Sequence, residues 1–442
     1  MQTVFCVAIF QVRGQEPSFE RRLPEESMSR IVRQDDVRRL NQFGILRALR
    51  RHGPLSRTAL SSLTGLSPST VTVITNSLIE RGVLTDRLPE TSTVNKRGRP
   101  QVLIAPNGRH ATIATIRLAR GVVEVALFDY AGLELGRREL RRRTLSLAPE
   151  SIVRLMVELV DGLAEETGRG RATIVRIAVA VEGIVDSAGR LLLSTPFADV
   201  HEMDIASLLE AEFGASAEVM NDCNAVAEGL TWTAPEASGE NFAALLMANG
   251  VGLGLAINGK MLSGPKSSGM EFGHMIYQPG GALCRCGRRG CIEAYAGIYA
   301  IRRAVAGEDP NVVIEDVPEN DTLVDIVEKA RRADGPERQA LKEAGRALGN
   351  GLVNLFTLFD SVPLIMAGAS TIALEFMMEE IRTAFANESF GRRVEPDIVD
   401  VYPDAPKLMR QGAVLKALAT YDMSLPDQDE LAPEEAVSIA RP

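Results

Sequence analysis

The sequence predicts an α/β protein with two lobes, preceded by a winged helix-turn-helix domain. Three helical patterns and a basic hairpin occupy residues 31–105, and strands alternate with helices through residues 106–423. A chain of 442 residues with 45% hydrophobic and 24% charged residues is long enough for several globular domains. Residues 1–30 are polar and irregular, and residues 424–442 are acidic and contain proline. Both ends are therefore predicted to be disordered.

Local signals delimit the N-terminal helices. Apolar residues recur at a helical period over residues 35–51, and a Gly-Pro pair ends that helix. A second, shorter helix is predicted over residues 56–63. For the third helix, Ser67 is a good N-cap, Pro68 suits the first helical position, and Gly82 ends the helix. This succession predicts a helix-turn-helix.

The third predicted helix has two different faces. Val71, Ile74 and Leu78 form an apolar stripe that would pack inward. The opposite face carries small polar residues, which allow a helix to lie close to base edges in the major groove of DNA. The residues predicted to contact DNA from this helix and its N-cap are Ser67, Ser69, Thr70, Thr72 and Asn76.

A two-stranded wing is predicted to follow. Short strands at 83–85 and 102–104 flank a loop with Arg97 and Arg99 at its tip, which could enter a minor groove or hold phosphates. Residues 30–100 carry 13 Arg and Lys against 5 Asp and Glu, a net +8, although the whole chain has a net charge of -9. This asymmetry favours nucleic-acid contact through the first part alone. A helical protein-interaction module, or a basic surface without a partner, is the alternative.

A compact group of potential metal ligands lies near the middle of the chain. His274 is followed by Cys284, Cys286 and Cys291, so three of the five cysteines fall within eight residues. One imidazole and three thiolates make a closed tetrahedral set for structural Zn²⁺. Four glycines between positions 280 and 290 would let the backbone turn tightly enough for all four ligands to reach one ion. The alternative is three reduced cysteines in a glycine-rich loop.

Sparse cysteine use predicts a reducing compartment and no disulfide framework. The opening MQTVFCVAIFQVRG lacks a basic segment before its apolar run, so we interpret it as a non-structural or misassigned start and not as a signal peptide. No apolar run approaches the roughly 18 residues of a membrane span. These observations predict a cytoplasmic protein without a membrane partner.

The remainder of the chain predicts two similar α/β lobes with a cleft between them. The pattern begins with a three-stranded meander and a helix, continues with a buried strand ending in a turn, and then has a strand that runs into a helix at Asn221-Asp222. A second strand pair with a glycine-rich turn follows. The segments expected to form these elements are 113–118, 122–129, 136–142, 148–167, 174–186, 214–229, 241–262, 336–360 and 363–370.

Several of these motifs resemble the ROK family of bacterial repressors, open reading frames and sugar kinases, over about residues 35–425. The matching pieces include GHMIYQPGGALCRCGRRGCIEAYAG, the Asn221-Asp222 pair, INGKMLSG and GIVD. The N-terminal helix-turn-helix with its RGRP wing resembles the transcriptional-regulator branch. The resemblance implies an actin-like (ribonuclease-H-like) body with a sugar site between its lobes, and assembly as a homo-dimer or tetramer.

The same resemblance implies a set of sugar ligands. Asn221 and Asp222 match the pair that binds sugar hydroxyls, and the Asp is the general base in the kinases. His274 matches a residue that holds zinc with one ring nitrogen and sugar with the other, within a zinc loop at 271–293. Such a site recognises hydroxyls through convergent carboxylates and amides. The implied sugar-binding residues are Asn221, Asp222, Glu271, His274 and Glu293. Solvated surface acids are the alternative for Asp222 and Glu271.

The chain departs from the family pattern at the ATP motifs. Arg117 stands where the first phosphate turn has an acid, and Ala119 replaces a glycine there. The second turn has lost its opening Gly-Thr, at Ala248-Asn249, and the third reads Ala367-Gly368-Ala369. Because phosphoryl transfer needs close backbone approach to phosphates and an acid near magnesium, we predict that the protein is not an enzyme. Arg117 could itself attract phosphate, which leaves nucleotide binding open.

Two departures concern the sugar side. Pro196-Phe197 stands in place of Pro-Asn, and Glu182-Gly183 in place of Pro-Gly. Either change could alter the choice of sugar or weaken its binding.

These observations together predict a sugar-responsive DNA-binding regulator, most simply a repressor of carbohydrate metabolism genes. A dimer would place its recognition helices in operator half-sites about 34 Å apart, and a sugar or sugar derivative would favour another geometry. One alternative is a sugar kinase with a fused DNA-binding domain. Another is a repressor that a protein partner controls.

Overall fold

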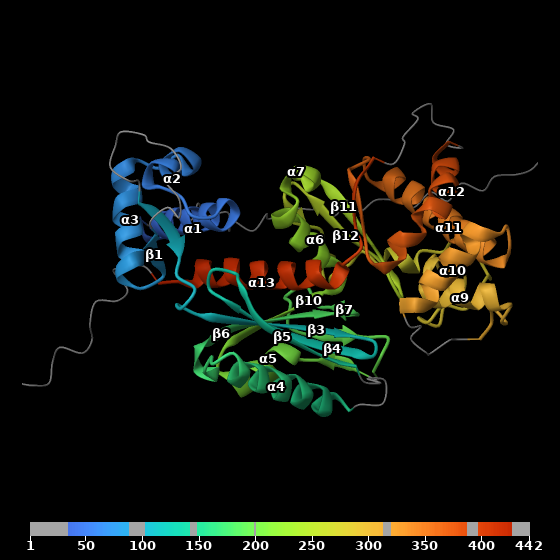
Figure 1. Ribbon diagram of the computed structural model, residues 1–442, viewed down its shortest axis with the longest axis horizontal. Coiled ribbons are helices and arrows are strands. Elements are labelled where there is room, and N and C mark those ends of the chain that lie inside the picture. Colours follow the sequence, from blue (N-terminus) through green and yellow to red (C-terminus); the bar gives the residue numbers. More distant parts are fainter. Residues whose placement is uncertain are drawn as a thin grey trace, which may run out of the picture.

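The computed structural model describes residues 34–87, 102–141, 148–198, 200–312, 320–386 and 397–426. A small helical domain precedes a body with two five-stranded sheets, as Figure 1 shows. The predicted ends 1–30 and most of 424–442 lie outside the described residues. At the C-terminal end, α13 (Ala405–Ser424) continues into the predicted tail, and Leu425 is buried. The folded part therefore extends two residues beyond the predicted end at 423.

The N-terminal domain has the predicted winged helix-turn-helix architecture. Ser67 caps the third helix by accepting a hydrogen bond from the Thr70 N–H at 3.1 Å, and Pro68 is the first helical residue. Gly65 closes the helix before it in the left-handed conformation. The predicted domain boundary at residue 105 falls inside the second strand of the wing, which ends one residue later. The elements are α1 (Gln34–His52), α2 (Arg57–Thr64), α3 (Pro68–Glu80), β1 (Leu84–Arg87) and β2 (Leu103–Pro106), with β1 and β2 antiparallel.

The first lobe is built on a mixed sheet in the order β10-β6-β3-β4-β5. The predicted meander forms its antiparallel half, and two parallel strands complete it. Helices α4 and α5 cover one face and share a core with alternate residues of β3, β4 and β6. The elements are β3 (Thr112–Ala119), β4 (Val122–Asp129), β5 (Glu134–Arg141), α4 (Pro149–Glu166), β6 (Ile174–Val181), β7 (Ile184–Val185), β8 (Leu192–Ser194), β9 (His201–Met203), α5 (Ile205–Phe213) and β10 (Ser216–Asn221).

The second lobe repeats this arrangement, since its sheet has the order β13-β12-β11-β14-β15 with the same antiparallel and parallel halves. The prediction of two similar α/β lobes is therefore confirmed. The elements are β11 (Phe242–Met247), β12 (Val251–Ile257), β13 (Lys260–Met261), α8 (Glu293–Ala296), α9 (Ile298–Ala306), α10 (Asn320–Arg332), α11 (Pro336–Leu358), β14 (Leu364–Ala367), α12 (Leu374–Ala386) and β15 (Ile398–Tyr402).

Two helices lie between the sheets. α6 (Asp222–Thr233), which α7 (Pro235–Ser238) follows, shares a core with β11 and β14 of the second lobe, and α13 packs on β3 and β6 of the first. The two helices touch through their backbones, because a side chain at Gly229 would overlap the Leu408 carbonyl and one at Gly412 the Ala225 carbonyl. α13 thus contacts both lobes.

The winged helix-turn-helix domain shares a hydrophobic core with the body. Ile45 and Leu49 of α1 belong to the same buried cluster as Ile113 and Phe128 of the first sheet and Leu418 of α13. In Figure 1, α13 runs from the helical domain at one end to α6 at the other. The predicted helical domain is therefore packed against the body in this structure, and α13 forms much of the contact.

Candidate functional site

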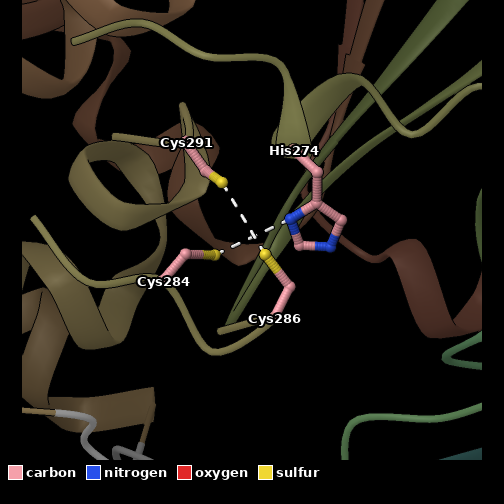
Figure 2. A group of neighbouring side chains, drawn as sticks. All are labelled: His274, Cys284, Cys286 and Cys291. Carbon is pink, nitrogen blue, oxygen red and sulfur yellow. Dashed lines mark hydrogen bonds between the residues drawn. The ribbon is translucent and has the colours of Figure 1, made fainter. Parts of the chain in front are cut away.

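The four predicted metal ligands converge on one point. Their ligand atoms all lie within 4.8 Å of one another. Cys286 Sγ and Cys291 Sγ are 3.7 Å apart, and Cys284 Sγ is 3.7 Å from Nδ1 of His274 (Figure 2). A tetrahedron with zinc–sulfur bonds of about 2.3 Å has sulfur–sulfur distances of about 3.8 Å. The spacing of the donor atoms therefore fits a structural zinc ion.

Tight turns bring these ligands together. Cys291 pairs with Ile276 in an isolated β-bridge, which holds the last cysteine beside the segment that follows His274. Gly287 and Gly290 adopt positive φ angles of 81° and 79°, and a side chain at Gly290 would overlap the carbonyl of Gln278. Gly280 also has a positive φ, of 73°, and a side chain at Gly281 would overlap the Tyr295 hydroxyl, so the loop geometry favours glycine at all four positions.

The ionisation of the ligands also suits a metal. Burial raises the pKa of Cys284 well above its usual range and that of Cys291 to about 11. These thiols therefore need a bound cation to ionise at neutral pH. Burial lowers the pKa of His274, which favours the neutral imidazole that a metal ligand requires.

His274 joins the metal cluster to the predicted sugar ligands. Its Nδ1 faces the thiols, and its Nε2 lies 3.8 Å from Oε2 of Glu271. Glu293 is buried close by, with Oε1 at 3.8 Å from Cys284 Sγ and Oε2 accepting the Val251 N–H at 3.2 Å. The zinc loop thereby positions two carboxylates and one imidazole nitrogen.

The other two predicted sugar ligands stand where β10 becomes α6. Asn221 caps the helix: its Oδ1 accepts the Cys223 N–H at 2.9 Å, and its Nδ2 donates to the Gly183 carbonyl at 2.8 Å. Asp222 is the first helical residue, and its Oδ1 also accepts the Cys223 N–H, at 2.9 Å. The strand-to-helix junction predicted from the sequence is confirmed, and it fixes both side chains.

Two carboxyl groups of this region have strongly raised pKa values. Burial, reinforced by the charge of Glu182, raises the pKa of Asp222 to about 7. Burial likewise raises the pKa of Glu293 to about 7, and the charge of Glu182 adds to the shift. Glu271 is close enough to contribute to the shift of Asp222. The structure thus gathers acids from both lobes, as expected for a site that pairs hydroxyl groups.

Glu182 also belongs to this group of acids, although it is not among the sugar ligands predicted from the sequence. It follows β6, and its Oε2 accepts the backbone N–H of Arg120 at 2.9 Å. The signal that could have identified it is the departure from Pro-Gly at positions 182–183. Phe197, the other departure, is fully buried in the core of the first lobe. Its ring therefore packs away from solvent, and it supplies no polar group.

The segments that resemble the family's phosphate turns take part in ion pairs and helix packing. Arg117 lies 3.6 Å from Glu124 and 3.4 Å from Glu139 in ion pairs on the first sheet, with only 13% of its side chain exposed. In the second turn, side chains at Gly252 or Gly254 would overlap Cys223 of α6. The glycines that remain are required for helix packing, and Arg117 is engaged by carboxylates.

The predicted DNA-contacting face of α3 is accessible. Ser67, Ser69, Thr72 and Asn76 are exposed and Thr70 is half-buried. Arg57, at the start of α2, donates to Oδ1 of Asn76 at 2.8 Å, a positioning contact that the periodicity of α3 gave no reason to expect. Arg97 and Arg99 lie outside the described residues, although the strands on either side of their loop pair as predicted.

Comparison with known proteins agrees with this architecture. A family model described as "ROK family" matches residues 113–417, and one described as "Winged helix-turn-helix DNA-binding" matches residues 38–85. The chain belongs to the ROK family. Its body is therefore the actin-like fold that the resemblance implied, and the N-terminal domain is the predicted winged helix-turn-helix.

Two curated relatives of the chain are regulators. It is 25% identical over 358 residues to the "DNA-binding transcriptional dual regulator NagC" of Escherichia coli (strain K12), covering 80% of this chain and 86% of that one. It is 24% identical over 383 residues to the "Xylose repressor" of Bacillus spizizenii, covering 87% and 94%.

Solved structures show the same fold. A ROK family transcriptional regulator, described as a homolog of the E. coli MLC protein, superposes with a TM-score of 0.70 at 23% identity, over 88% of this chain and 97% of that one. A ROK family glucokinase from Streptomyces griseus, in complex with glucose and AMPPNP, has a TM-score of 0.56 at 23% identity, over 69% and 99%. The regulator match includes the N-terminal part, whereas the kinase match covers a share of the chain that corresponds to the body. Within the described residues, no helix is both long and apolar enough to cross a membrane.

Proposed function

We propose that this protein is a sugar-responsive DNA-binding transcriptional repressor of the cytoplasm, with a structural zinc ion and no kinase activity. The observation that carries the proposal is the arrangement around His274, whose two nitrogens face the thiol cluster and Glu271. The proposal combines a hydroxyl-pairing site with a recognition helix whose predicted DNA-contacting face is accessible. The relatives named NagC and xylose repressor support the assignment to regulators.

In this proposal, the sugar is held by groups from both lobes. Asn221 and Asp222 contribute from the start of α6, and Glu271, His274 and Glu293 from the zinc loop. Each carboxylate accepts a sugar hydroxyl, and an analogue that lacks this hydroxyl leaves a buried acid unpaired. A sugar bound there would bridge the lobes, which gives it a means to change their relative position.

Zinc has a structural role in the proposal. His274, Cys284, Cys286 and Cys291 would supply all four ligands of a tetrahedral site, which would leave no open position for a substrate. When bound, the ion fixes the loop and orients the His274 ring so that Nε2 points toward Glu271. Loss of the metal would release three of the five sugar ligands from their positions.

Operator DNA is the macromolecular partner in the proposal. α3 would enter the major groove with the exposed residues Ser67, Ser69, Thr72 and Asn76, while Arg97 and Arg99 of the wing would contact the minor groove or phosphates. A homo-dimer or tetramer would present two such helices to half-sites about 34 Å apart. The absence of kinase activity rests on Arg117, which pairs with Glu124 and Glu139 where phosphoryl transfer needs an acid.

The test is fluorescence anisotropy with labelled DNA from upstream of the protein's own gene, with and without D-xylose, D-glucose or N-acetyl-D-glucosamine. The expected result is DNA binding that one sugar shifts. Asp222→Asn should abolish the shift, and Asp204→Asn, which also alters an acid at a helix start, should leave it intact. Asn76→Ala should weaken DNA binding, whereas Ser62→Ala on α2 should not. Absence of DNA binding would refute the proposal, and ATP-dependent phosphorylation of a sugar would refute its non-enzymatic part.

A further inference from the structure

We propose that α13, together with a buried cluster of Arg50, Asp422 and Tyr130, is the joint through which the sugar site sets the position of the DNA-binding domain. This inference rests on the proposed function and assigns the regulation of the same site. It concerns residues that have no part in binding zinc, sugar or DNA.

The cluster joins three segments that are distant in sequence. Arg50 of α1 forms a two-point ion pair with Asp422 of α13, with Nε at 2.5 Å from Oδ2 and Nη2 at 2.8 Å from Oδ1. Its Nη1 donates to the Tyr130 carbonyl at 2.9 Å, and the Tyr130 hydroxyl donates to Asp422 Oδ1 at 2.5 Å. The guanidinium also lies 4.6 Å from the centre of the Tyr130 ring. Each of the three groups therefore contacts the other two.

The cluster is almost sealed from solvent. The side chains of Arg50 and Asp422 are 3% and 1% exposed, and Tyr130 is fully buried. Burying an ion pair gives little net stability compared with packed apolar groups, but it fixes geometry because an unpaired buried charge is costly. A buried two-point pair between α1 and α13 therefore defines a single orientation of the two helices.

The other end of α13 is fixed to the helix that begins at the sugar site. Gly229 and Gly412 allow α6 and α13 to meet backbone to backbone, so at this crossing no side chain lies between them to absorb a relative shift. Arg410, also on α13, pairs with the buried Glu124 of β4 at 2.9 Å. A displacement of α6 must consequently be shared by α13 or strain these contacts.

Asn221 and Asp222 occupy the start of α6, so a sugar that binds them acts directly on this helix. The path then has two steps, from α6 to α13 by backbone contact and from α13 to α1 through Asp422 and Arg50. Small helix shifts at packed interfaces are a known means of transmitting ligand binding. Here the shift would rotate or translate α1, and with it the recognition helix, relative to the body.

The first test needs neither sugar nor DNA. Hydrogen exchange of the full-length, zinc-loaded protein is compared for wild type, Asp422→Asn, Tyr130→Phe and Glu380→Gln. Glu380→Gln is the control for loss of a two-point ion pair elsewhere, since it removes the more exposed pair with Arg346 in the second lobe. Tyr130→Phe removes one hydroxyl and keeps the ion pair, so it remains informative if Asp422→Asn folds poorly.

For Asp422→Asn we expect faster hydrogen exchange in α1 and also in the first turn of α6. Tyr130→Phe should accelerate exchange in the same two places by a smaller amount. Glu380→Gln should leave exchange in both helices as in the wild type. Faster exchange confined to the residues around positions 50, 130 and 422 would overturn the proposal. That outcome would show a purely local structural role.

The second test measures coupling. DNA affinity is determined with and without whichever of D-xylose, D-glucose and N-acetyl-D-glucosamine shifts the wild type. In Asp422→Asn the sugar effect on DNA affinity should fall to within about twofold of unity, while sugar affinity of the DNA-free protein stays within about twofold of wild type. If sugar changes the DNA affinity of Asp422→Asn as much as that of the wild type, the proposed role of α13 and the cluster is refuted. If no sugar shifts the wild type, the proposed function fails, and the exchange experiment still decides whether α13 couples α1 to α6.

Discussion

The raised pKa of Asp222 makes the start of α6 a site where ligand binding and stability oppose each other. Asp222→Asn keeps the shape of the side chain and removes its charge. In the folded chain the pKa of this carboxyl is about 7, because burial disfavours the charged form, against an ordinary value of 3.8. The folded state therefore prefers the protonated acid, and ionisation at neutral pH destabilises it.

The sign and size of the effect follow from this difference. Well below the ordinary pKa of 3.8 the carboxyl is protonated in both the folded and the unfolded state, and it has no effect on stability. As the pH rises to about 7, the unfolded chain ionises first and stability falls, and above that the penalty is constant. Three pKa units correspond to about 4 kcal/mol, which the partial exposure of the residue reduces to about 3 kcal/mol. The free energy of unfolding of Asp222→Asn, relative to that of the wild type, should therefore increase by about 2 kcal/mol between about pH 5 and about pH 8.

The assay is urea unfolding of zinc-loaded wild type and Asp222→Asn, followed by circular dichroism at the two pH values. Asp204→Asn is the control, because the Ser207 N–H and neighbouring groups lower the pKa of Asp204 below its ordinary value. Since this carboxyl is ionised in the folded and the unfolded chain at both pH values, the stability that the variant loses should be the same at the two. A pH-independent difference between Asp222→Asn and wild type would refute the assignment of a buried, protonated Asp222. The stabilised variant is also expected to lose sugar binding.

Three other expectations concern metal, packing and DNA. Cys284→Ser should lower the zinc content measured by a chromophoric chelator and weaken sugar binding, whereas full zinc occupancy would contradict the four-ligand site. Gly412→Ala should destabilise the protein by several kcal/mol in thermal unfolding, because its methyl group would overlap the Ala225 carbonyl, while Gly44→Ala, which has open space, should not. The double variant Arg97→Ala/Arg99→Ala should reduce the slope of the logarithm of DNA affinity against the logarithm of salt concentration, by the amount expected for the loss of about two phosphate contacts. An unchanged slope would exclude the wing from the interface.

Short-range features could be predicted well from the sequence. The capping of α3 by Ser67 and the junction at Asn221-Asp222 depend on neighbouring residues, so their signals are local. The cysteine cluster is equally local, since its three thiols lie within eight residues and only His274 comes from outside this stretch. The two similar α/β lobes could be predicted from the alternation of strands and helices, whereas the order of strands in each sheet is seen only in the structure.

Long-range features could not be predicted in the same way. No pattern around Arg50 indicates a partner 372 residues later, because an arginine near the end of a predicted helix has many possible partners. The contact of Gly229 with α13 depends on how the two lobes close on each other, which periodicity does not encode. Glu182 joins the acidic group only because β6 ends beside the start of α6. Such contacts arise from topology, so only the folded chain reveals them.

The ion pairs of Arg117 limit which residues can replace it. Arg117→Asp would place a third carboxylate beside Glu124 and Glu139, with Arg410 left as the nearby cation that pairs with Glu124. This single change would therefore destabilise the sheet that supports α13. An acid at position 117 would require compensating changes on β4, β5 and α13. The charges of the first sheet thus couple the residue at this turn to the helix that contacts both lobes.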